Sequence, residues 1–328
     1  KLANQCNNLD GFMIFHSLGG GTGSGFSSLL FDCLKNEYPK ATKFNIAIFP
    51  SEVFSSSNYE IYNTVLSAHS IIDHMKICFS FDNKSLYNVS KNFLDVGNPR
   101  FKTLNEIVCQ VTSSITNPLR HSESNAEKST LNIFRSYPDL FPDYMPNFSV
   151  CSYAPLYPIL RSCAQFSIDD LTKIVFQPDS ALIESNIQKC KYYACGLFYR
   201  GDVCLRDINI AIQSIYGRRN FHLIYQSLKY FKIGMNYLCP SNIVDSEMTK
   251  YFRSLCLVAN TTAISDKWRK INQEFILMYQ KRQFIHSYVC EGMEQLEFEE
   301  AQDELIKLIS KYGEIEESDS ETEEEEDL

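Results

Sequence analysis

The sequence predicts an α/β protein with a doubly wound parallel-sheet domain, a core helix, a second mixed α/β domain, a C-terminal helical hairpin and a disordered acidic tail. Three observations support this fold class. An apolar strand pattern leads through a glycine-rich turn into a helical pattern and a second strand, which is a βαβ unit. Strand and helix patterns then alternate along the middle of the chain. Two long helical patterns end just before a run of acidic residues.

The βαβ unit comes first in the chain. Residues 11–18 have the apolar pattern of a strand. Residues 26–35 have the pattern of a helix, because apolar side chains recur at helical spacing and Pro39 ends the run. The same reasoning predicts a second strand, a helix and a third strand at residues 44–49, 59–75 and 77–81. These elements extend one parallel sheet.

A long amphipathic helix is predicted next, over residues 103–119, with Leu104, Ile107 and Val111 on its apolar stripe. A polar region follows it. Further strands are predicted at residues 148–150, 192–199 and 231–237, and helices near 169–175 and 207–214. Two long helices, over 265–280 and 293–312, come last. We expect the basic residues of the first of them, among them Lys267 and Lys270, to lie on a solvent-exposed face.

Composition and charge exclude several classes of protein. No apolar run reaches the roughly 18 residues that a membrane helix needs, so no membrane partner is expected. The twelve cysteines show no C-x-x-C pair and no zinc-like spacing with histidine, which predicts reduced thiols and no metal ligands. Residues 314–328 hold ten acidic and no basic residues, and the whole chain carries a net charge of −9. The rest of the chain is therefore near neutral, which does not favour binding to nucleic acid.

The glycine-rich turn is the feature that points to chemistry. Residues 19–25 read Gly-Gly-Gly-Thr-Gly-Ser-Gly, between a predicted strand and a predicted helix. Glycines allow successive N–H groups to face one concavity, and the following helix adds its positive end, so the turn suits phosphate groups. It lacks the Gly-Lys-Ser/Thr of a P-loop and the G-x-G-x-x-G of a Rossmann turn. The alternative is a flexible turn, against which the flanking elements argue.

This glycine run on a strand-to-helix turn resembles the signature loop of the tubulin family. Other segments are similar to α-tubulins, namely Tyr-Arg-Gly-Asp-Val at 199–203, Asn-Thr-Thr-Ala-Ile at 260–264, Leu-Met-Tyr-Gln-Lys-Arg at 277–282 and Glu-Gly-Met-Glu at 291–294. The resemblance covers essentially the whole chain and begins inside the family's nucleotide domain. We therefore expect the family's first segment, with its residues near magnesium, to belong upstream of Lys1.

The resemblance implies that the nucleotide is GTP, bound together with Mg²⁺. Phosphate binding falls to Ser17, Gly20, Gly21, Thr22 and Gly23. The other residues that it assigns to GTP are Ser56 and Glu60 near the ribose, Asn83 and Asn105 at the guanine, and Phe101 stacked on the base. An amide offers the donor and acceptor that guanine requires, and an aromatic ring suits stacking.

The catalytic position departs from the family pattern. In α-tubulins an acid near the start of a helix acts on the GTP of the β-subunit. Two alignments put Leu131 or Ile133 at that position, and neither side chain can act as an acid or base. Glu127 is the nearby carboxylate and the candidate catalytic residue, the alternative being a solvent-facing acid at a helix start. The family is one of GTPases, but whether this chain is a hydrolase stays open.

The resemblance also implies partners and a location. It implies a heterodimer with β-tubulin, assembly into microtubules of the cytoplasmic cytoskeleton, and motor and associated proteins recruited by the acidic tail. Residues 156–166, at the lateral loop, contain no His and are one residue shorter than in the family. This difference weakens the expected polymer contacts. The alternative, which the absence of the family's first segment favours, is a truncated tubulin that does not polymerise but caps or sequesters, with little or no GTP binding.

The sequence predicts five segments. They are a partial GTP-binding domain at 1–100, a core helix at 101–120, an intermediate α/β domain at 121–264, C-terminal helices at 265–313 and the acidic tail at 314–328.

Overall fold

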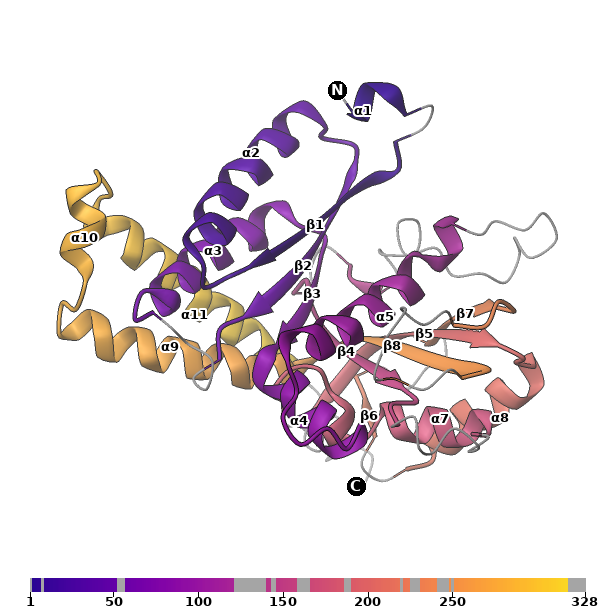
Figure 1. Ribbon diagram of the computed structural model, residues 1–328. Helices are drawn as coiled ribbons and strands as arrows, with labels where there is room; N and C mark the ends of the chain where they lie inside the picture. The colour runs from indigo at the N-terminus through magenta and orange to yellow at the C-terminus, as the bar shows by residue number, and fades with distance from the viewer. Residues whose placement is uncertain are drawn as a thin grey trace, which may run out of the picture. The chain divides into compact units, whose positions relative to one another are not determined.

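The computed structural model describes residues 2–6, 9–51, 57–120, 140–142, 146–157, 166–185, 190–218, 221–224, 231–240, 248 and 251–317 (Figure 1). The chain forms two compact units. The first comprises Lys1–Ser80, Asp143–Phe148 and Ser265–Leu328, and the second comprises Phe81–Pro142 and Ser149–Ile264.

The first unit holds the predicted βαβ element. β1 (Gly11–Ser17) pairs in parallel with β2 (Thr42–Phe49), in a register that joins Gly11 to Thr42 and Ser17 to Ile48. The segment between them contains a single π-helical turn, η1 (Thr22–Phe26), and α2 (Ser27–Glu37). β3 (Ile77–Asp82), whose last two residues belong to the second unit, lies next to β2 in the sheet. The parallel α/β fold class predicted for this part is confirmed.

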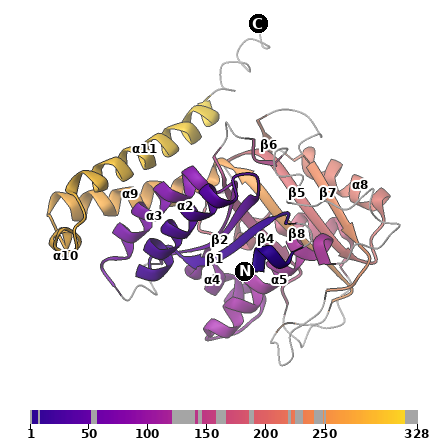
Figure 2. The same ribbon diagram turned by 90° about the horizontal axis from the view of Figure 1, so that it is seen from above.

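Helices complete the first unit. They are α1 (Leu2–Gln5), α3 (Glu60–His74), α9 (Ser265–Gln280), α10 (Ile285–Cys290) and α11 (Gln295–Glu317). α3 connects β2 to β3 and packs against α2, α9 and α11, as Figures 1 and 2 show. α9 and α11 form the predicted helical hairpin, and α11 continues to Glu317, into the first residues of the acidic run.

The core of the first unit is aromatic. Trp268 of α9 is fully buried, and its ring lies 5.0 Å from that of Phe49 and 4.9 Å from that of Phe148. Tyr62 of α3, also fully buried, contacts Phe275 of α9 at 5.5 Å and Phe298 of α11 at 5.3 Å. These edge-to-face contacts fix α3 against the hairpin.

The second unit is mixed, as predicted. β4 (Phe148–Ala154), whose first residue belongs to the first unit, pairs antiparallel with β8 (Arg253–Thr261), and β8 pairs antiparallel with β5 (Lys191–Gly201). β6 (His222–Leu223) and β7 (Phe231–Asn236) both pair in parallel with β5. The sequence did not predict β8, although it is the strand between β4 and β5.

The helices of the second unit are α4 (Asn83–Phe93), α5 (Phe101–Arg120), α7 (Ile168–Val175) and α8 (Leu205–Tyr216), with short 3-10 turns η3 (Pro178–Ser180) and η6 (Thr262–Ile264). α7 packs on α8, and α4 packs on α5. α7 begins with a capping box, in which Ser167 and Asp170 each accept a hydrogen bond from the other's backbone N–H. The predicted helix at 103–119 is α5.

Within the part of the chain that the structure describes, no helix is long and apolar enough to cross a membrane.

Candidate functional site

The glycine loop is held in place by hydrogen bonds from its own side chains and from β1. Ser24 Oγ donates to the carbonyl oxygens of Gly20 at 2.8 Å and Gly21 at 3.2 Å. His16 Nδ1 lies 2.6 Å from the carbonyl oxygen of Gly23, and because a carbonyl only accepts, the imidazole must donate. The loop is therefore an ordered structure rather than the flexible turn that the sequence left as the alternative.

The helix after the loop starts earlier than predicted. The sequence predicted a start near Phe26, whereas the helical turn η1 begins at Thr22 and runs directly into α2. The Ser24 hydroxyl donates hydrogen bonds to the carbonyl oxygens of Gly20 and Gly21, one turn back. As a result, the positive end of the helix lies at the glycines themselves, next to Thr22, and not beyond them.

The glycines of the loop serve two different purposes. A Cβ added to Gly23 would lie 2.2 Å from the carbonyl oxygen of Ser17, so no other residue fits there without a backbone shift. A Cβ on Gly20 or Gly21 would meet nothing within 4 Å, and both residues are exposed. The structure therefore closes the loop at Gly23 and leaves an open cradle at Gly20 and Gly21, of the kind that an approaching phosphate group would fill.

The first turn of α3 lies against this loop. A Cβ on Gly19 would lie 3.1 Å from Cβ and Cγ of Glu60, so the Glu60 side chain passes directly over that glycine. Asn63, one turn further along α3, donates from Nδ2 to the carbonyl oxygen of Gly19 at 2.8 Å. The glycine loop and the first turn of α3 are thus held together. Asn63 is a positioning residue that the sequence did not predict, because a lone Asn in a helix carries no signal.

A pocket of about 330 Å³ adjoins Glu60 in the first unit. Its other polar lining includes Ser51, Ser57, Lys267 and Lys270. Lys267 is buried, so the predicted solvent-exposed face is wrong for this residue. Lys267 is one of the residues of α9 that line the pocket. The pocket is therefore lined by residues with hydroxyl groups, by two lysines and by two carboxylates, those of Glu60 and Glu274, which suits a polar, charged ligand.

The second unit holds the other predicted residues. Asn83 is the first residue of α4, at a helix start capped by Asp82, whose Oδ1 accepts from the backbone N–H of Lys84 at 3.1 Å. Phe101 and Asn105 lie one turn apart at the start of α5, so they share a face of that helix. Both are exposed, Phe101 by 61%. An exposed ring beside an exposed amide is unusual for a helix whose other face is buried.

Some predicted residues lie outside the described part of the chain. They are Ser56, Glu127, Leu131 and Ile133, together with residues 158–165 of the lateral loop and residues 318–328 of the tail.

Comparison with known proteins identifies the family. Residues 1–91 match the model of the Tubulin/FtsZ family GTPase domain, and residues 146–273 match that of the Tubulin C-terminal domain. The chain is 40% identical over 316 residues to the tubulin alpha-2B chain of Physarum polycephalum, which covers 96% of this chain and 70% of that relative. The chain belongs to the tubulin family.

Other relatives give the same result. The tubulin alpha-1B chain of Physarum polycephalum and the tubulin alpha-3 chain of Saccharomyces cerevisiae are also 40% identical, over 316 and 317 residues. Each match covers 96% of this chain and 70% of the relative. This tubulin thus resembles α-tubulins across both of its units, and the glycine loop with η1 and the start of α3 lies inside the matched GTPase domain.

Proposed function

We propose that this tubulin is an α-type subunit that binds GTP, pairs with β-tubulin and enters microtubules as a structural component of the cytoplasmic cytoskeleton. The observation that carries GTP binding is the open cradle at Gly20 and Gly21, closed at Gly23 and bordered by Glu60. In a chain that belongs to the tubulin family, this cradle is suited to the phosphates of a guanine nucleotide.

We assign the residues of the first unit to the phosphates and the ribose of the nucleotide according to their chemistry. Backbone N–H groups of Gly20, Gly21 and Gly23 and the hydroxyls of Ser17 and Thr22 would hold the phosphates. The carboxylate of Glu60 would accept hydrogen bonds from the ribose hydroxyls, and Ser56 would act beside it. Mg²⁺ would accompany the phosphates, because it binds readily to phosphate oxygens.

For the second unit, the family resemblance suggests that Asn83 and Asn105 bind guanine and that Phe101 stacks on it. The exposure of Phe101 and Asn105 supports this assignment. The catalytic role of Glu127 stays a proposal from the sequence. We also keep the five-segment division of the chain, from 1–100 to 314–328, as a proposal.

GTP binding is tested by titrating the full chain with a fluorescent mant-GTP analogue. Glu60→Gln should weaken binding about tenfold to a hundredfold, because a hydrogen bond to a charged group is worth about 1.5–3 kcal/mol. Glu37→Gln, at the exposed end of α2, is the matched control and should bind as the wild type does. Equal affinity in the two variants would remove Glu60 from the ribose site, and no binding by the wild type would overturn the nucleotide proposal.

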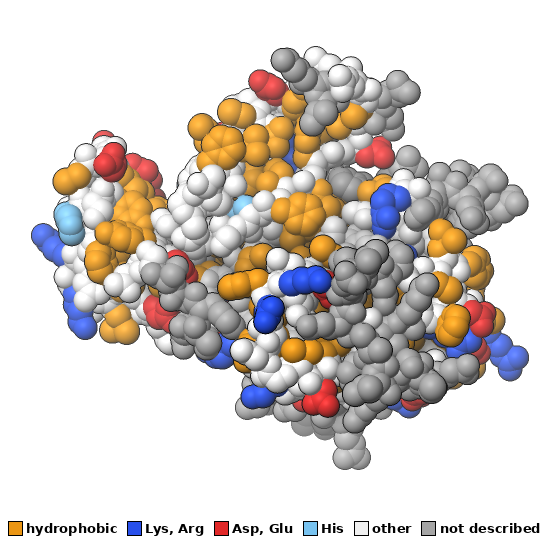
Figure 3. Space-filling view, viewed as in Figure 1, with side chains coloured by type: hydrophobic (Ala, Val, Ile, Leu, Met, Phe, Trp, Pro, Cys, Tyr) orange, Lys and Arg blue, Asp and Glu red, His pale blue; other side chains and the backbone are white. Residues whose placement is uncertain are grey.

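An exposed apolar surface in the first unit supports the proposal that this chain assembles with other protein subunits. Phe15 of β1, Phe26 of η1 and Leu29 of α2 are each about 60% exposed, and Figure 3 shows apolar side chains gathered over β1 and α2. Such a surface favours contact with other protein segments over exposure to solvent.

Co-sedimentation with microtubules tests whether the chain is incorporated into the polymer. A chain that stays in the supernatant and lowers the polymer mass would instead support capping or sequestering.

A further inference from the structure

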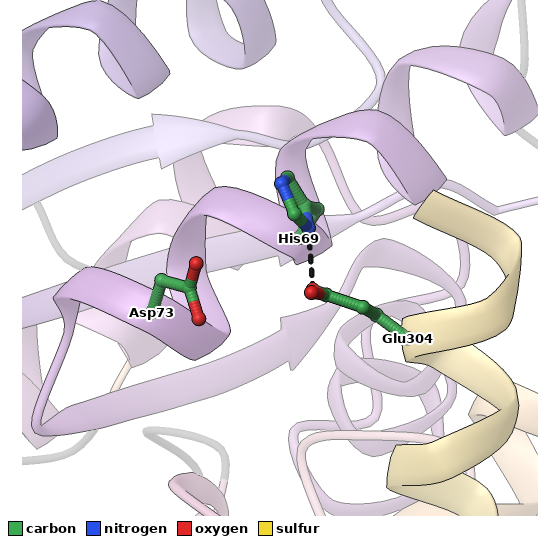
Figure 4. Close-up of side chains that lie close together, drawn as sticks. All are labelled: His69, Asp73 and Glu304. Atoms are coloured by element: carbon green, nitrogen blue, oxygen red, sulfur yellow. Dashed lines mark hydrogen bonds and ion pairs between the residues drawn. The ribbon is translucent and has the colours of Figure 1, made fainter. Parts of the chain in front are cut away.

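A second cluster of ionisable side chains lies away from the glycine loop, between α3 and α11 of the first unit. His69 and Asp73 come from α3 and Glu304 from α11, and one ligand atom of each lies within 4.8 Å of the other two. Figure 4 shows Glu304 reaching from α11 to the His69 ring and Asp73 following on α3. His69 Nδ1 and Glu304 Oε2 form a hydrogen bond. The cluster thus brings together residues from opposite ends of the chain.

Buried neighbours fix the backbone of all three residues. His69 and Asp73 are four residues apart, which places them on one face of α3. Ala68 and Ile71 on the same helix are buried, and so are Ala301 and Leu305, which flank Glu304 on α11. Because the two helices pack against each other, the three side chains need only rotamer adjustments to converge on one point.

The donor set points to a particular class of ion. One imidazole nitrogen and two carboxylate oxygens form a set that binds Zn²⁺, with metal–ligand distances of about 2.0–2.2 Å and a fourth position left for water. Mg²⁺ and Ca²⁺ prefer oxygen ligands throughout, so the histidine disfavours them. The two carboxylates also balance the charge of a divalent cation. An acidic cluster alone would lack this selectivity, which depends on His69.

We propose that His69, Asp73 and Glu304 bind one Zn²⁺ ion that joins α3 to α11. The ion would replace the hydrogen bond between His69 and Glu304, and Asp73 would turn toward it as the third ligand. It would tie the hairpin that ends in the acidic tail to α3, whose first turn lies against the glycine loop. Sequence spacing could not predict this site, because His69 and Glu304 are 235 residues apart.

The test is Zn²⁺ binding to the full chain, measured by competition with a chromophoric chelator. Exposed cysteines such as Cys33 and Cys290 are first alkylated, and excess Mg²⁺ occupies weak acidic sites. The wild type should show one saturable Zn²⁺ site, and His69→Gln and Glu304→Gln should each lower its affinity at least tenfold. The matched controls are His286→Gln on α10 and Asp303→Asn, the residue before Glu304, both exposed. These two should bind as the wild type does.

A second measurement uses the wild-type chain alone, so it does not require that the variants fold. Diethyl pyrocarbonate modifies accessible histidines, and the His69 side chain is 43% exposed. Zn²⁺ should protect His69 from this modification in the wild type while His286 stays reactive, as read by peptide mass spectrometry. The proposal fails if Zn²⁺ leaves His69 labelling unchanged, if the wild type shows no saturable site, or if both ligand variants bind Zn²⁺ within about twofold of the wild type.

Discussion

His16, the second-last residue of β1, makes the stability of the fold around the glycine loop depend on pH. Burial lowers the pKa of its imidazole below the usual 6.5, and the hydrogen bond to Gly23 offsets this only in part. The unfolded chain therefore takes up this proton at a higher pH than the folded chain does. Between the folded pKa and 6.5 the unfolded state binds more protons, so the free energy of unfolding falls as the pH falls through that window.

This predicts a pH-dependent loss of stability that His16→Gln reduces. On acidification from about pH 7.5 to about pH 5.5, a window that spans the usual histidine pKa, the melting temperature of the wild type should fall more steeply than that of the variant. Carboxylates contribute equally to both proteins and cancel in the comparison. His286→Gln, an exposed histidine, should keep the slope of the wild type. Parallel curves for wild type and His16→Gln would contradict the argument.

Single residues were predictable where they belong to a motif and not where they only support one. The glycine run predicted a phosphate-binding type of loop. The sequence alone could not show that the carbonyl oxygen of Ser17 leaves no room for a side chain at Gly23, whereas Gly20 faces open space. That distinction depends on how close β1 comes to the first turn of the helix. Asn63 and Lys267 were missed for the same reason, because only tertiary packing turns them toward the loop and the pocket.

At the scale of elements, an aromatic cluster holds α3 to the C-terminal helices. Tyr62 contacts Phe275, Phe298 and the ring of Tyr288 on α10, and its hydroxyl donates to the carbonyl oxygen of Gln283 at 2.9 Å. Phe298 is fully buried. Phe298→Ala should therefore lower the free energy of unfolding by about 3–5 kcal/mol in urea titrations, because it leaves a cavity between three helices.

Leu296 supplies the matched control for this cluster. It lies two residues before Phe298 on α11 and is 56% exposed. Leu296→Ala should change the free energy of unfolding by less than about 0.5 kcal/mol. Similar losses for both variants would mean that α11 is held by something other than the aromatic contacts.

Elements with a long amphipathic period were predictable, and the others were not. α9 has the predicted bounds, Ser265–Gln280, and α5 differs only at its ends. β8 was missed because it is buried on both faces, so its residues show no alternation that separates a strand from a helix. α4 has eleven residues and is rich in Asn, Ser and Lys, so few apolar side chains mark it although Leu86 and Val89 are buried on one face. α10 is a six-residue helix whose N-cap, Phe284, has a left-handed backbone (φ 59).

At the scale of the whole molecule, charge and packing are separated along the last helix. The side chains of α11 that are buried end at Tyr312, and the whole of the acidic run at 314–328 follows it. Residues 318–328 contain seven acidic and no basic residues, so their removal changes the net charge from −9 to −2. Residues 318–328 thus hold most of the net charge and none of the buried side chains of α11, so this charge can be removed without changing the packing.

Truncation after Glu317 should therefore leave the fold intact and weaken association with basic partners. The melting temperature should stay that of the full chain, because no buried residue of α11 is lost. Binding of a lysine-rich peptide, followed by fluorescence anisotropy, should weaken strongly at low ionic strength, and the difference between the two chains should vanish as salt screens the charges. A chain of equal length in which the seven acids are replaced by Gln is the matched control and should behave as the truncation does. If that control instead binds the peptide as the full chain does, the tail acts through its length or sequence rather than its charge.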